Sequence, residues 1–435
     1  MVISGRTVVL DTETSRLASL TLLAGGKLIF SPDNQIILSS DYILIDNEGI
    51  MEIGTPDCPY AGQAEIVLTG DRNDEKEIEG FGQKFLGVKE GGSLSIYGED
   101  RLSWTRLETD INQGQSSITV QDDVSSWRPG DKIVVTSTEL DWEQAEVFTI
   151  ASVNGNDIIL EEVANFDHAG RTIDGKIEMR AEVGLLSRNI KIHGEVNENC
   201  NDEEALDEDV DADCLHFGGH TKALRGFKQY DIKGAELFHM GQRTVLGAYP
   251  IHFHLCVDTD ADGTNPLISQ NSIHNCFSRC VTIHGTHGIH VENNVAYDTF
   301  GHCFFLEDGG EKRNVFDRNL GIGSRKNDLT PSDKRPTVFW ITSPETQLTN
   351  NVAAGSDIHK GIGIWYLFPD EVVQPSKEIH DLEGVFYDRK EAKHTPILPF
   401  EVRFIHPIHT LFICFIHRTT LLTLMEKLEL VCSIG

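Results

Sequence analysis

Histidine and acidic side chains recur in short alternating segments, at positions where they could bind a metal or transfer protons. Residues 250–255 alternate apolar and polar side chains, so His252 and His254 should point away from the core. Two later segments repeat this alternation and place His284 and Glu307 on the same outer side. If these segments are adjacent strands about 4.8 Å apart, His254, His284 and Glu307 form one outward column.

Two imidazoles and a carboxylate in one column can bind a divalent metal or act as a proton-transfer pair. The predicted metal ligands on these strands are His252, His254, His284 and Glu307. A ladder of polar side chains on a solvated sheet is the alternative interpretation.

Three further residues, Arg279, His302 and Asp308, stand at the entrances and exits of the same strands. Enzymes that cleave polysaccharides need a pair of carboxyl groups, or a base beside a cation that neutralises the acid group of the sugar. Glycosidases hold their two carboxyl groups roughly 5–5.5 Å or 6.5–9.5 Å apart. Together with His254, His284 and Glu307, these three residues are the predicted catalytic candidates.

An acidic loop follows the first of these strands. Asp258, Asp260 and Asp262 alternate and precede Gly263, as in the first half of a calcium-binding loop. An EF-hand is excluded because Ser269 stands where that loop needs a bidentate glutamate. The sequence therefore predicts at most a looser oxygen site for Ca²⁺ at these three aspartates.

Nine cysteines are present, an odd number that does not fix the redox compartment. Cys200 and Cys214 bracket an acidic run at 202–213 that we expect to be a solvated loop. In an exported protein these two cysteines could form a disulfide, which chain entropy credits with about 3 kcal/mol. Cys280 and Cys303 share one column and are expected to pack as stacked thiols.

The elements that must hold these residues are strands, because β-branched and aromatic runs alternate with glycine, asparagine and aspartate turns. Residues 278–285 match 301–308 at an offset of 23, and Asn271 and Asn294 keep that offset, with Asn319 following. Such a repeat predicts a parallel β-helix with one repeat per rung. An evenly spaced β-sandwich is the alternative.

Within the strand at 250–255, the alternation predicts that Ile251, Phe253 and Leu255 face the core. Changes of pattern along the chain divide it into four parts. These are an N-terminal β domain with an incomplete start (1–106), a compact β unit (107–180), the parallel β-helix (181–390) and an atypical tail (391–435).

Composition restricts the function. The 435 residues include 37 Lys and Arg and 68 Asp and Glu, a net charge of −31, which disfavours binding of nucleic acid. No apolar run is long enough for a transmembrane helix. The first residues show neither the charged start nor the apolar stretch of a signal peptide, so the sequence alone gives no export signal.

Several of these segments also resemble a known family, that of the cell surface hyaluronidase and the cell migration-inducing and hyaluronan-binding protein, and they resemble fibrocystin-L. The segments that carry the resemblance are 180–190, 217–220, 236–242, 249–255, 277–285 and 301–309, and the glycine pattern around 41–55 resembles the G-eight domain.

The resemblance implies an all-β protein with an N-terminal G-eight domain and a right-handed, pectin lyase-like parallel β-helix. It also implies an extracellular or cell-surface location, hyaluronan or a related glycan as partner, hyaluronidase activity and calcium dependence. The α/β module that hyaluronan-active members carry after the G-eight domain is missing here, because 104–107 runs into 116–120 through a short link. A non-catalytic, fibrocystin-like binding module is therefore the alternative function.

Overall fold

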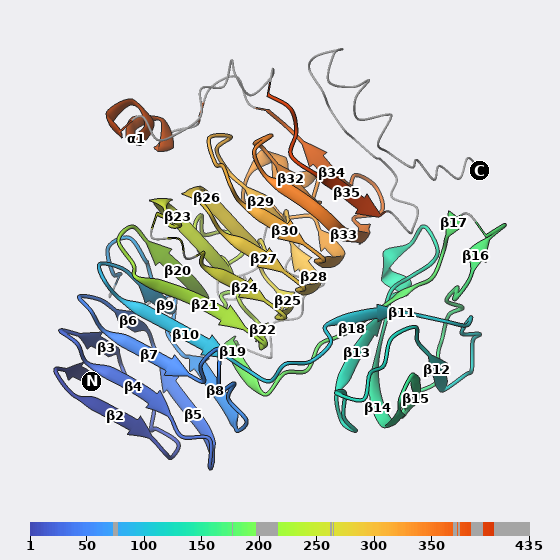
Figure 1. Ribbon diagram of the computed structural model, residues 1–435, viewed down its shortest axis with the longest axis horizontal. Helices are drawn as coiled ribbons and strands as arrows, with labels where there is room; N and C mark the ends of the chain where they lie inside the picture. Colours follow the sequence, from blue (N-terminus) through green and yellow to red (C-terminus); the bar gives the residue numbers. More distant parts are fainter. Residues whose placement is uncertain are drawn as a thin grey trace.

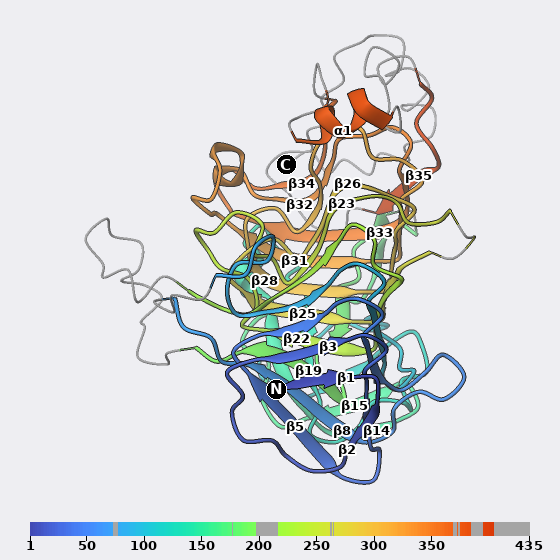
Figure 2. The ribbon, with the colours of Figure 1, turned by 90° about the vertical axis from the view of Figure 1, so that its left-hand side faces the viewer.

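The computed structural model describes residues 1–72, 77–175, 177–196, 216–261, 263, 265–368, 372, 375–383 and 395–403 (Figure 1). Their strands stack in parallel as the rungs of a β-helix, which confirms the predicted fold class. Each complete rung contributes one strand to each of three ladders. Figure 2 shows the rungs stacked from the N-terminal strands at the bottom to α1 (Ser376–Glu383) at the top.

The first ladder carries the residues with candidate chemistry. Its strands, in order, are β1 (Val2–Ser4), β3 (Leu20–Leu23), β6 (Ile43–Ile45), β9 (Phe85–Val88), β20 (His220–Leu224), β23 (Ile251–Asp258), β26 (Val281–His287), β29 (Phe304–Leu306), β32 (Thr337–Ile341) and β34 (Ile362–Tyr366).

The other two ladders complete the rungs. The second comprises β2 (Thr7–Leu10), β4 (Lys27–Phe30), β7 (Ile50–Ile53), β10 (Ser93–Tyr97), β21 (Gln229–Lys233), β24 (Leu267–Ser269), β27 (His290–Glu292), β30 (Val315–Asp317), β33 (Gln347–Ser356) and β35 (Phe400–Arg403). The third comprises β5 (Gln35–Ser40), β8 (Gln63–Leu68), β19 (Ile190–Gly194), β22 (Ala235–Phe238), β25 (Ser272–Cys276), β28 (Val295–Phe300), β31 (Leu320–Arg325) and again β33.

The parallel pairing begins at β1, whereas the repeat pattern placed the first rungs near residue 181. The N-terminal region is therefore part of the same solenoid, since β9 pairs directly with β20. The chain leaves the solenoid after β10 and returns at β19, which lies between β8 and β22. The intervening residues form an insertion within one rung, beside the solenoid in Figure 1.

The insertion has a six-stranded sheet and its own apolar core. Its strands are β11 (Trp104–Arg106), β12 (Ser117–Thr119), β13 (Lys132–Val135), β14 (Glu146–Asn154), β15 (Asp157–Leu160) and β18 (Glu182–Leu185), with the pair β16 (Thr172–Ile173) and β17 (Ile177–Glu178) beside them. A short 3₁₀ helix, η1 (Trp142–Gln144), contacts β31 and β33.

Apolar packing fixes the insertion against the outer side of the third ladder. Trp104 and Val134 pack with Val295 and Ile322 in one buried cluster. Trp142 lies so close to Gly323 that a Cβ there would stand 2.3 Å from its ring. Glycine is therefore required at this contact.

Asparagines form a buried ladder at one corner of the solenoid. Asn271, Asn294, Asn319 and Asn351 are all fully buried, and each of the first three donates from Nδ2 to the Oδ1 of the next. Each Nδ2 also donates to a backbone carbonyl of the preceding rung, such as that of Ile268 for Asn294. The predicted repeat is thus confirmed, and the ladder supplies the corner carbonyls with partners that buried polar groups need.

The register in the first ladder also follows the predicted repeat. Ile283 pairs with Leu306, and His254 pairs with His284 despite the longer spacing between them. The prediction that Leu255 faces the core is wrong. A bulge after His254 gives Leu255 a φ of 55° and leaves it half-buried, while Cys256 packs into the core instead.

The prediction of stacked thiols is also wrong, because Cys280 and Cys303 form a disulfide between two consecutive rungs. Cys200, Cys214 and the acidic run 202–213 lie outside the described residues. In the part of the chain that is described, no helix has both the length and the apolar character to cross a membrane.

Candidate functional site

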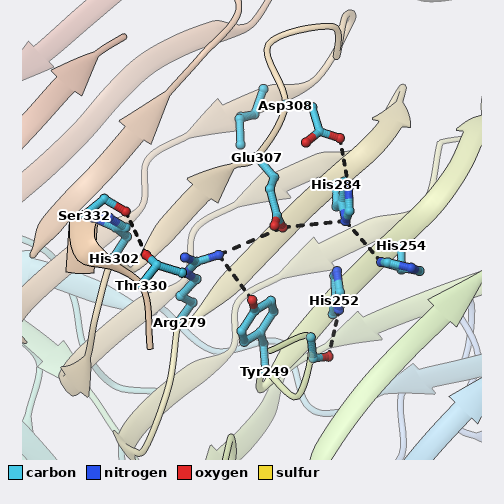
Figure 3. A network of polar contacts seen from close by, with 12 residues as sticks. Tyr249, His252, His254, Arg279, His284, His302, Glu307, Asp308, Thr330 and Ser332 are labelled. Carbon is cyan, nitrogen blue, oxygen red and sulfur yellow. Dashed lines mark hydrogen bonds and ion pairs between the residues drawn. The ribbon is translucent and has the colours of Figure 1, made fainter. Parts of the chain in front are cut away.

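The candidate residues gather on the outer face of the first ladder, which we call the histidine face. It consists of the outward side chains of β20, β23 and β26, together with Arg279, Glu307 and Asp308 (Figure 3). His254 and His284 are paired in register, and Glu307 follows directly after β29 in the next rung. The predicted outward column is therefore present.

The histidine face is not the solvated ladder of the alternative interpretation. His252 and His284 are only 1% and 6% exposed, and Thr282 between them is fully buried. Glu307 keeps a side-chain exposure of 21%. Together with the half-buried His254, it is the part of the column that solvent reaches.

His284 is the centre of a polar network. Its Nδ1 lies 3.1 Å from Nδ1 of His254 and 3.6 Å from Oε2 of Glu307. Its Nε2 lies 2.8 Å from Oδ2 of Asp308. One imidazole therefore contacts both carboxylates, that of Glu307 and that of Asp308.

Arg279 approaches the same carboxylate from the other side. Its Nη1 lies 3.9 Å from Oε2 of Glu307 and donates a hydrogen bond to Oη of Tyr249 at 3.2 Å. Its Nη2 donates to Oδ2 of Asp333 at 3.1 Å, and its guanidinium carbon stands 3.9 Å above the ring of Phe305. The guanidinium is thus held rigidly beside Glu307, as Figure 3 shows for its contacts with Tyr249 and Glu307.

Sequence reasoning missed Asp333, which comes from the 3₁₀ helix η4 (Pro331–Lys334), between β31 and β32. Its Oδ2 accepts hydrogen bonds from the backbone N and the hydroxyl of Thr330, which form a capping box. A Thr-x-x-Asp pattern is a recognisable signal for a helix start. It does not reveal that the aspartate reaches Arg279.

His302 does not join the network around Glu307. Its ring packs against Trp340 at 4.4 Å and Phe305 at 5.2 Å, and its Nε2 lies 3.7 Å from Asp333. Burial lowers the pKa of His302 to about 3, although the Asp333 carboxylate opposes the shift. The structure therefore places His302 behind Arg279, where it supports Asp333.

The histidines of the column differ in protonation. Burial lowers the pKa of His284, but the carboxylates of Glu307, Asp308 and Glu311 overcome that effect and raise it to about 9. Burial, the charge of His284 and nearby Lys222 lower the pKa of His254 to about 3. At neutral pH, His284 is therefore a cation that donates from Nδ1 to the neutral His254.

Three segments cover the histidine face. The loop between β22 and β23 brings Tyr249 onto Arg279 and the carbonyl of Gly247 onto His252. The η4 helix contributes Asp333. Ser376, at the start of α1, donates a hydrogen bond to Asp308. Sequence patterns gave no indication of this cover.

The acidic loop does not fit calcium in this structure. Asp258 and Asp260 both bind the guanidinium of Arg313, which occupies the oxygens that the ion would need. Asp262 lies outside the described residues. The histidine face fits calcium no better, because that ion takes oxygen ligands and the face offers mainly imidazole nitrogens.

Comparison with known families identifies both halves of the solenoid. Residues 1–108 match the model of the G8 domain, and residues 216–411 match the model of the CEMIP beta-helix. The chain belongs to the family that combines these two domains. The G8 domain and the CEMIP beta-helix are thus consecutive parts of one continuous stack, with the insertion between them.

The relatives that match this chain include proteins named for hyaluronan and proteins with other names. The cell surface hyaluronidase of Danio rerio is 29% identical over 91% of this chain and 42% of its own length. Fibrocystin-L of Mus musculus is 36% identical over 86% of this chain and 9% of its own. The cell migration-inducing and hyaluronan-binding protein of Homo sapiens is 39% identical over 61% of this chain and 22% of its own. The chain spans less than half the length of each.

Proposed function

We propose that this chain is an extracellular or cell-surface protein that binds hyaluronan or a related acidic glycan and hydrolyses it at the histidine face. The carrying observation is the network in which one imidazole joins Glu307 to Asp308 beside Arg279. The names of the hyaluronidase relatives support the choice of glycan. The disulfide supports an oxidising, extracellular location.

Charge complementarity requires local cations, because a chain with a net charge of −31 repels a polyanion. Arg279 and Lys222 lie beneath the face, where their positive charge would reduce the repulsion of a sugar carboxylate. Glu307 is the reachable carboxylate, and its Oε2 accepts no hydrogen bond from any described residue.

In the proposed hydrolysis, Glu307 takes a proton from the attacking water and gives it to the glycosidic oxygen as that oxygen leaves. The water oxygen bonds to the anomeric carbon as the glycosidic bond breaks, and each new chain end carries a neutral hydroxyl group. His284, whose Nδ1 lies 3.6 Å from Oε2, holds the Glu307 carboxylate in position. Asp308 positions His284 through the second ring nitrogen.

The alternative is a fibrocystin-like module that binds its ligand without cleavage. The cover over the face favours it. In that case glycan binding survives the substitution His284→Ala.

Incubation of the full chain with high-mass hyaluronan, followed by sizing of the polymer, tests the proposal. The assay runs with calcium and with a chelator. Glu307→Gln is expected to slow cleavage by about 10²–10⁴, the usual contribution of a general acid or base. Glu292→Gln is the matched control, because Glu292 lies on β27 in the second ladder. Unchanged polymer length in every arm rejects cleavage and leaves the binding module.

A further inference from the structure

Three imidazoles on the histidine face come unusually close together. Nitrogen atoms of His252, His254 and His284 all lie within 4.8 Å of one another. Imidazole nitrogens at this separation suit a transition metal of the zinc type, which takes tetrahedral nitrogen and oxygen ligands at about 2.0–2.2 Å. We infer that these three histidines form a binding site for a zinc-like divalent cation.

His252 supports this inference through its hydrogen bonds. Its Nδ1 lies 2.9 Å from the carbonyl oxygen of Gly247, which can only accept, so Nδ1 carries the proton. Nε2 then holds a lone pair, yet it is buried and has no hydrogen-bond partner among the described residues. Figure 3 shows this second nitrogen directed toward His254 and His284. A buried acceptor without a partner is destabilising, and a metal ion would satisfy it.

The distance between His254 and His284 also supports a metal site. Their Nδ1 atoms face each other at 3.1 Å, so a proton or a cation must lie between them. Two nitrogens on one tetrahedral zinc ion stand about 3.3 Å apart, given bonds of ~2.0–2.1 Å. The present distance therefore matches that of two zinc-bound imidazoles, and a turn of the two rings would direct both nitrogens at one ion.

The surroundings also resemble those of metal-binding histidines, which usually pass their second ring nitrogen to a carbonyl or a carboxylate. His252 does so with Gly247, and the second nitrogen of His284 lies in ion-pair contact with Asp308 at 2.8 Å. Glu307 stands 3.6 Å from Nδ1 of His284 with an oxygen free of hydrogen bonds, so it can serve as the fourth ligand. The set is three imidazoles and one carboxylate, which excludes calcium as the preferred ion.

The inference adds regulation to the proposed catalytic site without depending on glycan cleavage. A cation bound to Nδ1 of His284 would also engage Glu307, the carboxylate that the proposed hydrolysis uses. Zinc should therefore inhibit cleavage if the chain is a hydrolase. Zinc should bind equally well if the chain is a non-catalytic binding module.

The test uses full-length protein without a histidine tag, stripped with a chelator and dialysed against Zn²⁺, Co²⁺ or Ca²⁺ alone. Elemental analysis should find about one zinc per chain, and Co²⁺ should give the visible absorption of a tetrahedral site. Ca²⁺ should not displace either metal. Wild-type protein that retains no zinc and shows no cobalt spectrum overturns the inference, whatever its activity on hyaluronan.

Variants then assign the ligands. His254→Gln should abolish the cobalt spectrum, whereas His274→Gln, on β25 and paired with Glu236, should leave it unchanged. Asp308→Asn should weaken zinc binding by about 10–100-fold, as expected for a residue that positions a ligand. Equal zinc affinity in His254→Gln and wild type would place the metal elsewhere. If His254→Gln does not fold, loss of affinity in Asp308→Asn decides the question.

Discussion

Replacing Arg279 with methionine tests how the histidine face is held together. Arg279 is 2% exposed, Asp333 is fully buried, and their closest contacts measure 3.1 and 3.4 Å. Methionine retains apolar contact with Phe305 but leaves the Asp333 carboxylate buried without its cation. Removing one partner of a buried ion pair costs about 3–5 kcal/mol. Asp333 still accepts hydrogen bonds from Thr330, so we expect the free energy of unfolding to fall by about 3 kcal/mol.

Thermal unfolding followed by tryptophan fluorescence measures this loss, since Trp340 packs on His302 next to Asp333. At roughly 2–4 °C per kcal/mol, the midpoint should fall by about 6–12 °C. The exposed pair of Arg16 with Asp41 provides a control, because Arg16→Met should cost about 0–1 kcal/mol.

A second substitution separates charge from packing. Adding Asp333→Asn to Arg279→Met removes the orphaned charge and should recover part of the lost stability, with a coupling energy of about 1–3 kcal/mol. If Arg279→Met is no more harmful than Arg16→Met, or if the double variant is as unstable as the two single effects added together, the buried pair does not organise the face.

Three further substitutions test the scaffold. Asn294→Ala removes a fully buried link of the asparagine ladder and should cost about 2–4 kcal/mol in chemical unfolding, whereas the exposed Asn34→Ala should cost less than about 1. Gly323→Ala forces a Cβ into the ring of Trp142 and should release the insertion, seen as faster proteolysis between residues 104 and 186. Burial raises the pKa of Glu182 to about 7, so its stabilising contribution is complete below about pH 4.5 and lost as the pH rises through 7. Unfolding midpoints of Glu182→Gln should therefore show a smaller decline between pH 5 and 8 than those of wild type, and parallel pH curves would contradict the assignment.

The sequence predicted the register of the central rungs because their strands recur at nearly constant spacing. Val281 and Phe304 pair at the predicted offset, and Asn294 stacks on Asn271. The first rungs were not recognised as part of the stack because their spacing varies, as Ile43 pairs with Leu86 after a much longer connection. Loop length changes the repeat without changing the stacking, so periodicity finds only the rungs with similar loops.

The cover over the histidine face could not be predicted from alternation. Alternation places a side chain inside or outside the solenoid, but burial of the outer face depends on loops that come from elsewhere in the chain. Asp333 reaches Arg279 across 54 residues, and Ser376 reaches Asp308 across 68. The disulfide, in contrast, could have been predicted from the sequence. Residues of one column on adjacent rungs lie about 4.8 Å apart, which is within the Cα–Cα distance that a disulfide needs.

Several buried polar atoms of the histidine face have no hydrogen-bond partner among the described residues. The asparagine ladder satisfies each amide, whereas Nε2 of His252, Oγ1 of Thr282 and Oε2 of Glu307 are buried without a hydrogen bond from any described residue. Each such atom costs about 1–3 kcal/mol, and all three come from successive rungs of one ladder. A ligand that bonds to them would recover that cost on binding, which is why the proposed metal and glycan chemistry both belong to this face.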